Sequence, residues 1–274
     1  PSTKADLGAH DENISFNGKI IALVAVPTGQ ATIEGRESGE TLGANSAVIF
    51  TGVETASTRL EGFTITNGQA ANGGGIHGGG STATIVNCTI TGNEAATYGG
   101  GLYRCDGLVE NCVIRGNTAG VRGGGLYSCG GTIRNCTISD NQSTGPAGGL
   151  GECDGTVAQC FVINNAAVTH GGGFWNCDGP IRHTVISGNT AGGDGGGGYN
   201  GKGAIQNCLI VENSAAGRGG GLYNCAGPIA NNTLVANAPQ GIHLNAISAT
   251  VTNTIVWDNG AYPISLATGA VLTI

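Results

Sequence analysis

The sequence predicts an all-β protein, a single-domain right-handed parallel β-helix with 24-residue coils, and three observations carry this prediction. One 24-residue unit recurs from residue 82 to residue 227, as in LVENCVIRGNTAGVRGGGLYSCGG and AIQNCLIVENSAAGRGGGLYNCAG. Each unit holds two apolar runs of strand length, broken by Gly, Asn and Asp. Glycine supplies 53 of the 274 residues, which disfavours helices. Because so short a unit cannot bury an apolar face alone, the units must stack, with equivalent strands paired in parallel about 4.8 Å apart.

The domain, residues 1–274, is expected to begin with irregular coils over residues 1–59. Within this part, ISFNGKIIALVAV and SAVIFTGV have the composition of strands, and ATIEGRESGETLGAN is expected to be a long loop between coils. Residues 60–227 are the regular repeats, and residues 60–81 form a transition coil at their start. Residues 228–274 are degenerate C-terminal coils, in which the glycine triplet is lost and the last apolar run breaks off.

One asparagine recurs in every repeat without a slip in spacing. At a tight turn, asparagine tolerates unusual backbone angles and bonds local backbone, and stacked amides also bond one another. We therefore predict a structural asparagine ladder rather than a ligand site. The triple glycine of each unit is expected at a second turn, where a Cβ would clash or φ is positive. The predicted ladder comprises Asn93, Asn117, Asn141, Asn165, Asn189, Asn213 and Asn237.

The ten cysteines form two columns, and a coil that lacks one member lacks both. Thr184 and Gly201 stand where one coil would have its two cysteines. This joint presence predicts five disulfides within coils, each worth about 3 kcal/mol and indicating an oxidising, extracellular setting. The alternative is ten reduced cysteines stacked as small buried hydrophobes. The predicted pairs all have the same spacing along the chain and are Cys88 with Cys105, Cys112 with Cys129, Cys136 with Cys153, Cys160 with Cys177, and Cys208 with Cys225.

An aromatic column follows the glycine triplets and is interrupted by Gly151. Because side chains alternate along a strand, this column is expected to face outward, opposite to the preceding aliphatic residue. It is either an aromatic ladder that stiffens one face or a platform for sugar rings or a partner solenoid. Its members are Tyr103, Tyr127, Trp175, Tyr199 and Tyr223.

Composition excludes several classes of function. The formal net charge is −7 and only 11% of residues are charged, so no basic footprint for nucleic acid is present. No apolar run approaches the length of about 18 residues that a membrane-spanning helix requires, so we expect no membrane insertion. The chain contains no Met and begins with Pro1, and we expect it to be a processed or excised piece of a longer precursor.

The unit IxNCxIxxNxA…GGGLY resembles the right-handed β-helix repeats of the pectate-lyase superfamily, over roughly residues 60–259. In texture it is most similar to the repeats of chlamydial polymorphic membrane proteins and of planctomycete-type surface proteins. The resemblance implies a surface-exposed solenoid. It specifies the coil far more than the activity, because the same coil carries lyases, hydrolases, adhesins and inert fibres.

Lyases of the superfamily use carboxylates, usually with calcium, and a basic residue on one outer face. Here the best acidic candidates are Glu152, Asp154 and Asp178, but both Asp residues lie in Cys-Asp-Gly turns, where Asp is ordinary turn chemistry. His170 and Asp194 fall on adjacent coils and would suit a general base. No nucleophile or long substrate loop accompanies them, so we assign no catalytic residue, no metal and no cofactor.

Two interpretations of function remain. The first is a non-catalytic extracellular or cell-surface solenoid, structural or adhesive, with a second copy stacked end to end or a surface glycan as its partner. The second is a β-helix that binds or degrades polysaccharide. Uniform columns and short loops favour the first interpretation.

Overall fold

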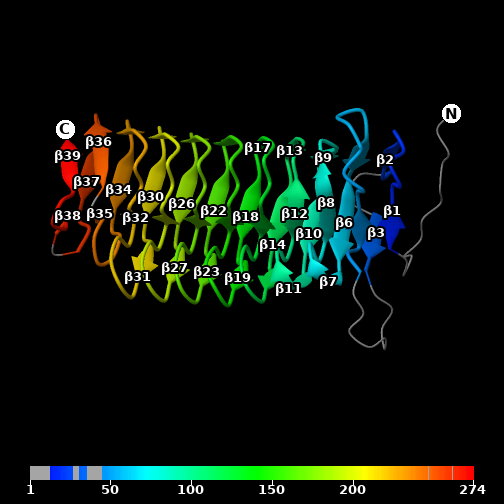
Figure 1. Ribbon diagram of the computed structural model, residues 1–274, viewed down its shortest axis with the longest axis horizontal. Coiled ribbons are helices and arrows are strands. Elements are labelled where there is room, and N and C mark those ends of the chain that lie inside the picture. Colours follow the sequence, from blue (N-terminus) through cyan, green and yellow to red (C-terminus); the bar gives the residue numbers. More distant parts are fainter. Residues whose placement is uncertain (1–12, 27–30, 36–44, 246, 261) are drawn as a thin grey trace.

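The computed structural model describes residues 13–26, 31–35, 45–245, 247–260 and 262–274. Their strands form four parallel β-sheets that run side by side along one axis, and successive coils stack from one end of the rod to the other (Figure 1). This confirms the predicted all-β solenoid. Within the described ranges, no helix is long and apolar enough to cross a membrane.

The strands of each sheet follow the axis in chain order. Sheet 1 consists of β1 (Ile14–Ser15), β4 (Val48–Ile49), β8 (Ile76–Ser81), β12 (Leu102–Cys105), β16 (Leu126–Tyr127), β20 (Leu150–Gly151), β24 (Phe174–Trp175), β28 (Gly198–Tyr199), β32 (Leu222–Tyr223), β35 (Ile242–Leu244) and β38 (Ile264–Leu266). Sheet 2 consists of β2 (Ala22–Val24), β5 (Arg59–Glu61), β9 (Thr84–Val86), β13 (Val109–Glu110), β17 (Ile133–Arg134), β21 (Val157–Ala158), β25 (Ile181–Arg182), β29 (Ile205–Gln206), β33 (Ile229–Ala230), β36 (Ser248–Thr252) and β39 (Val271–Thr273).

Sheets 3 and 4 complete the wall of the coils, and sheet 4 extends only from β7 to β31. Sheet 3 consists of β3 (Ala31–Glu34), β6 (Phe63–Thr66), β10 (Thr89–Thr91), β14 (Val113–Arg115), β18 (Thr137–Ser139), β22 (Phe161–Ile163), β26 (Val185–Ser187), β30 (Leu209–Val211), β34 (Thr233–Val235) and β37 (Ile255–Trp257). Sheet 4 consists of β7 (Gln69–Asn72), β11 (Glu94–Tyr98), β15 (Thr118–Ala119), β19 (Gln142–Ser143), β23 (Ala166–Ala167), β27 (Thr190–Ala191) and β31 (Ser214–Ala215).

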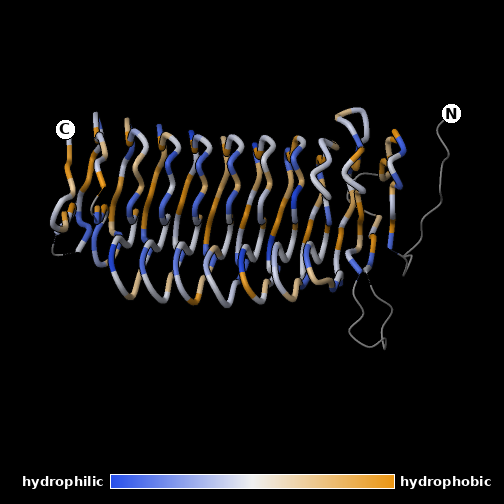
Figure 2. Tube along the Cα trace, viewed as in Figure 1, coloured by the Kyte–Doolittle hydropathy of each residue, from blue (hydrophilic) through white to orange (hydrophobic). Residues whose placement is uncertain are grey.

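The register between successive coils equals one sequence repeat wherever the repeat is regular. In sheet 3, Ile90 pairs with Ile114 and Ile114 with Ile138. In sheet 1, Leu102 pairs with Leu126. Equivalent residues therefore stack on one another, and the apolar stretches recur at the same place in successive coils (Figure 2). The inward aliphatic columns of sheets 1, 2 and 3 form one continuous buried core along the axis.

Each regular coil turns four corners, and a residue with left-handed backbone occupies each corner. In the coil from β12 to β16 these residues are Arg104 (φ 51°), Asn111 (φ 54°), Gly116 (φ 60°) and Gly123 (φ 69°). The glycine triplet lies at a corner, as predicted. Gly123 has the positive φ, and a Cβ on Gly124 would lie 2.3 Å from a main-chain oxygen.

The N-terminal part differs from the sequence prediction in one respect. Residues 31–34, at the start of the expected long loop, form strand β3, which pairs in register with β6. The short stretch ATIE alternates polar and apolar residues, and Ile33 is buried against the core. Its pairing partner, Ile65, lies further along the chain than one repeat, so the period could not reveal the pairing. The rest of that expected loop, residues 36–44, lies outside the described residues.

In the aliphatic column of sheet 1, one coil has a larger side chain than usual and the next coil has no side chain at the paired position. Phe174 replaces the usual Leu, and its ring fills the space that a side chain at position 198 would need. A Cβ added to Gly198 would lie 2.0 Å from Phe174 Cζ. The two residues pair directly across β24 and β28, so a large side chain in one coil requires a small one in the next.

This compensation predicts strong coupling between the two positions. We expect Gly198→Leu alone to lower the free energy of unfolding by about 1–3 kcal/mol through overpacking. Phe174→Leu alone should lower it by about 1–2 kcal/mol through a cavity beside Gly198. The double variant restores the repeat and should be more stable than Gly198→Leu. Urea unfolding of the four proteins measures this, and additive effects of the two substitutions would contradict it.

Candidate functional site

The asparagine ladder lies in the interior, at the corner between sheets 3 and 4. The side-chain Nδ2 of Asn141 donates to Oδ1 of Asn165 (2.9 Å), and the main-chain N of Asn141 donates to the same oxygen (3.1 Å). Nδ2 also donates to the carbonyl oxygen of Ile114, 2.9 Å away. Both Asn141 and Asn165 are fully buried. The amides of successive asparagines therefore satisfy one another's hydrogen-bonding groups, because each amide is both a donor and an acceptor.

The same contacts join all seven predicted asparagines, and the ladder continues to Asn259. Asn237 Nδ2 donates to Asn259 Oδ1 over 2.7 Å. The sequence prediction missed this last rung because it falls short of the regular period. The sequence analysis placed the unusual backbone angles of this corner on the ladder asparagine, which was wrong. The left-handed conformation at this corner falls on Gly116, directly before Asn117.

All ten cysteines are free and buried in the structure. The predicted disulfides within coils are therefore corrected. The two cysteine columns flank the strands of sheet 2 at opposite ends: Cys105 precedes β13, whereas Cys88 follows β9. The residue beside a cysteine is the equivalent cysteine of the next coil, as for Cys88 and Cys112, because Thr89 pairs with Val113. Spacing along the sequence could not show this separation across the strand.

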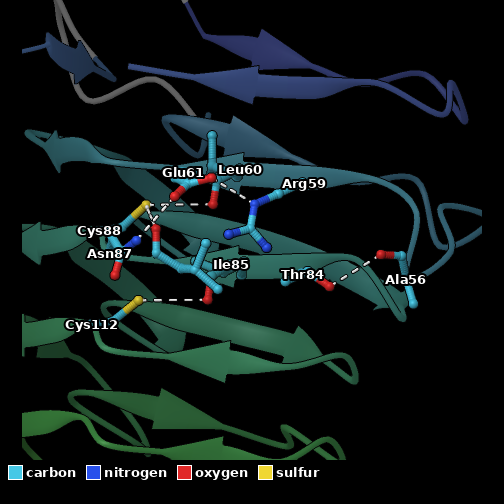
Figure 3. Close-up of polar contacts among 10 residues, drawn as sticks. Ala56, Arg59, Leu60, Glu61, Thr84, Ile85, Asn87, Cys88 and Cys112 are labelled. Carbon is cyan, nitrogen blue, oxygen red and sulfur yellow. Dashed lines mark hydrogen bonds and ion pairs between the residues drawn. The ribbon is translucent and has the colours of Figure 1, made fainter. Parts of the chain in front are cut away.

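The thiols act as buried donors at the ends of the sheet 2 strands. Cys88 Sγ donates to the carbonyl oxygens of Val86 (3.2 Å) and Leu60 (3.7 Å), and Figure 3 shows Cys88 and Cys112 one coil apart in the same orientation. Where the column changes, the donor is retained, since Thr184 Oγ1 donates to Arg182 O over 2.9 Å.

The aromatic column is a stack of rings along sheet 1. Tyr103 and Tyr127 stack with centroids 6.3 Å apart, and Tyr199 and Tyr223 with centroids 4.9 Å apart. Tyr127 and Tyr223 are only 6% exposed, so the column is less open than the predicted outward face. One cause is Tyr98, on the adjacent strand of sheet 4, whose ring stacks on both Tyr103 and Tyr127.

An arginine bridges the gap that Gly151 leaves in this column. The guanidinium of Arg122 lies 5.0 Å from the ring centroid of Trp175 and contacts the hydroxyl of Tyr127 at 3.4 Å. Burial raises the pKa of Tyr127 to about 12, even though the Arg122 contact favours the phenolate. Arg122 also lies 3.8 Å from a carboxylate oxygen of Glu152. A cation thus replaces the missing ring.

A shallow groove of about 570 Å³ follows the corner between sheets 1 and 2. The three acidic candidates, Glu152, Asp154 and Asp178, all line it, together with Lys202 and the amide row Asn176, Asn200 and Asn224. The structure therefore brings the candidates to one surface.

The aspartates of the groove take part in coil stacking. Asp154 Oδ1 accepts the main-chain N–H of Asp178 (3.0 Å), and Asp178 Oδ1 accepts that of Lys202 (3.3 Å). The ammonium of Lys202 also pairs with Asp178 at 2.7 Å. Among the described residues, no group of three or more His, Cys, Asp and Glu side chains is arranged to hold a metal ion.

His170 and Asp194 form a similar stacking contact rather than a His–carboxylate pair. The ring Nδ1 of His170 accepts the main-chain N–H of Asp194 (3.0 Å), and Asp194 Oδ1 accepts the N–H of Arg218 (2.8 Å). The imidazole also stacks on Tyr199, with centroids 4.7 Å apart.

Two buried ionisable residues were missed by the sequence analysis. His243 is 3% exposed, neither ring nitrogen has a hydrogen-bond partner among the described residues, and burial lowers its pKa. It continues the aromatic column by pairing with Tyr223 across a shorter coil, so the period hides it. Glu54, 2% exposed, accepts main-chain N–H groups of Gly18, Thr51 and Gly52 at 2.9–3.0 Å, and no repeat signals it.

The family model of the right-handed β-helix region matches residues 30–179 and 74–274. No curated protein and no solved structure matches the chain.

We predict that the ladder dominates stability in the regular coils. Asn165→Ala removes a partner from Asn141 and from Asn189 and should lower the free energy of unfolding by about 2–4 kcal/mol. Asn259→Ala, at the last rung, is the matched control and should cost less, since within the described part of the chain that amide has a ladder neighbour on one side only. Chemical denaturation compares them; equal effects would contradict the ladder's role.

The buried carboxylate of Glu54 predicts a pH-dependent stability. Burial by itself raises the pKa of Glu54, but the hydrogen bonds from Thr51 and Gly18 outweigh it and hold the pKa below its usual value. A carboxylate with a lowered folded-state pKa stabilises the protein above its unfolded pKa of about 4.3, and this contribution disappears as pH falls through the folded pKa.

We therefore expect Glu54→Gln to be less stable than the parent at pH 7, with a difference that shrinks in acid below about pH 4.3. Thermal unfolding between pH 7 and pH 3 measures this difference. Glu94→Gln, at an exposed position of sheet 4, is the control and should track the parent throughout. A difference in thermal stability between parent and Glu54→Gln that is the same at all pH values would contradict a stabilising role of the ionised Glu54 carboxylate.

Proposed function

The chain belongs to the right-handed β-helix family, and from this premise we propose that it is a non-catalytic structural or adhesive rod at the cell surface or outside the cell. The observation that carries the proposal is the unbroken asparagine ladder, which joins coils from Asn93 to Asn259. Hydrogen-bonded stacking over this length supports a stiff spacer that presents one surface repeatedly.

The use of polar side chains supports the same proposal. Asp154, Asp178 and His170 each accept a main-chain N–H of the following coil. These groups stabilise the stacking of coils, so their presence at the surface is explained without catalysis. The external location rests on the resemblance of the repeat to those of surface proteins.

End-to-end stacking of a second copy is the partner contact that we propose. Each coil already joins the next by in-register parallel pairing, as β36 joins β39 through Ser248 and Val271. The same pairing between copies would extend the rod without a new kind of contact.

The alternative function is recognition or degradation of a polysaccharide. The groove with Glu152, Asp154 and Asp178 favours it, because amide and carboxylate side chains there repeat at the coil spacing of about 4.8 Å. An extended glycan lying along the axis would therefore meet the same groups repeatedly. Aromatic rings of the sheet 1 column lie directly beside this groove in the sequence, as Trp175 beside Asn176.

Electron microscopy of the purified protein tests the structural proposal. We expect rods one β-helix wide that join into filaments. Leu272→Asp, in strand β39, should shorten the filaments and leave single rods, whereas Arg115→Asp on the outer face of sheet 3 should not. Single rods at every protein concentration would contradict end-to-end stacking.

Incubation with pectin, alginate and chondroitin, while unsaturated products are followed, separates the two functions. No product is expected from the parent protein. Product formation that is lost in Asp154→Asn and Asp178→Asn would overturn the non-catalytic proposal.

Protease treatment of intact producing cells tests the location, since surface-exposed protein should be digested.

A further inference from the structure

Two rows of four cysteines lie along the axis in the reduced protein, with one cysteine of each row in each of four successive coils. The first row joins four successive coils at the end of the sheet 2 strands, and the second joins four coils at the start of those strands. Every member is at most 3% exposed. The first row is Cys88, Cys112, Cys136 and Cys160, and the second is Cys105, Cys129, Cys153 and Cys177.

The register brings equivalent cysteines of adjacent coils side by side. Thr89 pairs with Val113, so the residues that precede them, Cys88 and Cys112, are lateral neighbours. Neighbouring strands lie about 4.8 Å apart, within the Cα separation of about 4.4–6.8 Å that a disulfide needs. Both side chains point the same way, since the thiol of Cys112 donates to Glu110 O (3.2 Å) as that of Cys88 donates to Val86 O (3.2 Å).

The second row has the same arrangement. Tyr103 pairs with Tyr127, which places Cys105 beside Cys129 two positions later. Leu150 pairs with Phe174 in the same way, which places Cys153 beside Cys177. The thiols of this row donate to carbonyl oxygens over 3.4–3.8 Å, which is longer than the shortest such contacts of the first row (3.1–3.2 Å), so less bonding is lost on oxidation here.

We propose that these thiols are sites of disulfide formation between equivalent positions of adjacent coils. The four pairs are Cys88 with Cys112, Cys136 with Cys160, Cys105 with Cys129, and Cys153 with Cys177. This pairing uses every member of both rows. The inference concerns only the oxidised form and does not depend on the proposed function.

The oxidant is a small disulfide such as glutathione disulfide. The thiolate of one cysteine attacks a glutathione sulfur, forms a mixed disulfide and releases one glutathione thiolate. The neighbouring cysteine thiolate then attacks the protein sulfur and releases the second glutathione. The protein pair loses two electrons and two protons, and glutathione disulfide becomes two glutathione thiols.

Two cysteines provide an internal control. Thr184 and Gly201 interrupt the columns before Cys208 and Cys225, and Asn232 takes the cysteine position in the coil after Cys208, so neither Cys208 nor Cys225 has a cysteine in an adjacent coil. Burial raises the pKa of Cys208 to about 11 and of Cys225 to about 12. These two residues are expected to remain thiols.

The experiment is refolding in a buffer of reduced and oxidised glutathione, which lets disulfides form and exchange before the interior closes. Remaining thiols are then alkylated in acid under denaturing conditions, and disulfide-linked peptides are identified by mass spectrometry without reduction. We expect four linked pairs and alkylation at Cys208 and Cys225. Linked pairs within one coil, such as Cys88 with Cys105, or alkylation of every cysteine, would overturn the proposal.

Two variants make the assignment specific. Cys112→Ser should abolish only the pair that contains it, leaving Cys88 alkylated and the other three pairs intact. Cys208→Ser is the matched control and should leave all four pairs unchanged. If Cys112→Ser instead moved the partner of Cys88 to Cys105, pairing within the coil would be favoured and the inference would be wrong. The circular dichroism spectrum verifies that each variant folds.

Discussion

The structure depends on one constraint, which is that each residue stacks on its own equivalent in the next coil. The neighbour of a side chain about 4.8 Å away is a copy of itself, so a column holds only groups that interact favourably with copies. Asparagine amides qualify because they donate and accept, as in Asn141 and Asn165. Charged residues do so when their signs alternate, as with Glu110 and Arg134 at 2.7 Å, or when a carboxylate accepts a main-chain N–H of the next coil, as Asp154 does.

A side chain that departs from the repeat is accommodated within one or two coils, because in its column it contacts only the equivalent residues of the adjacent coils. The larger ring of Phe174 is matched by Gly198. The missing ring at Gly151 is replaced by the guanidinium of Arg122. The missing thiol at Thr184 is replaced by a hydroxyl that donates to a carbonyl oxygen. Such local compensation lets a solenoid change its surface along the axis without losing its core.

Features that follow from the 24-residue period were predicted from the sequence. Features that depend on how the chain is placed within a coil, or on coils of another length, were missed. The period alone yielded the coil length, the aliphatic core and seven rungs of the ladder. It could not show that the cysteine columns lie at opposite ends of the sheet 2 strands. Strand β3, Asn259 and His243 escaped because their coils depart from the regular period. The left-handed residues at the corner between sheets 2 and 3 escaped because Asn111, Gln159 and His183 share a backbone conformation and no side-chain chemistry.

The inner columns are fixed by stacking, so they carry little information about what the rod recognises. Specific recognition requires positions where adjacent coils differ on the outside. The groove between sheets 1 and 2 is such a place, since Asp154, Asp178 and Lys202 occupy one outward column with opposite charges. The columns that build the rod and the positions that distinguish its surface are thus separate sets of residues, and this allows the surface to change while the fold is preserved.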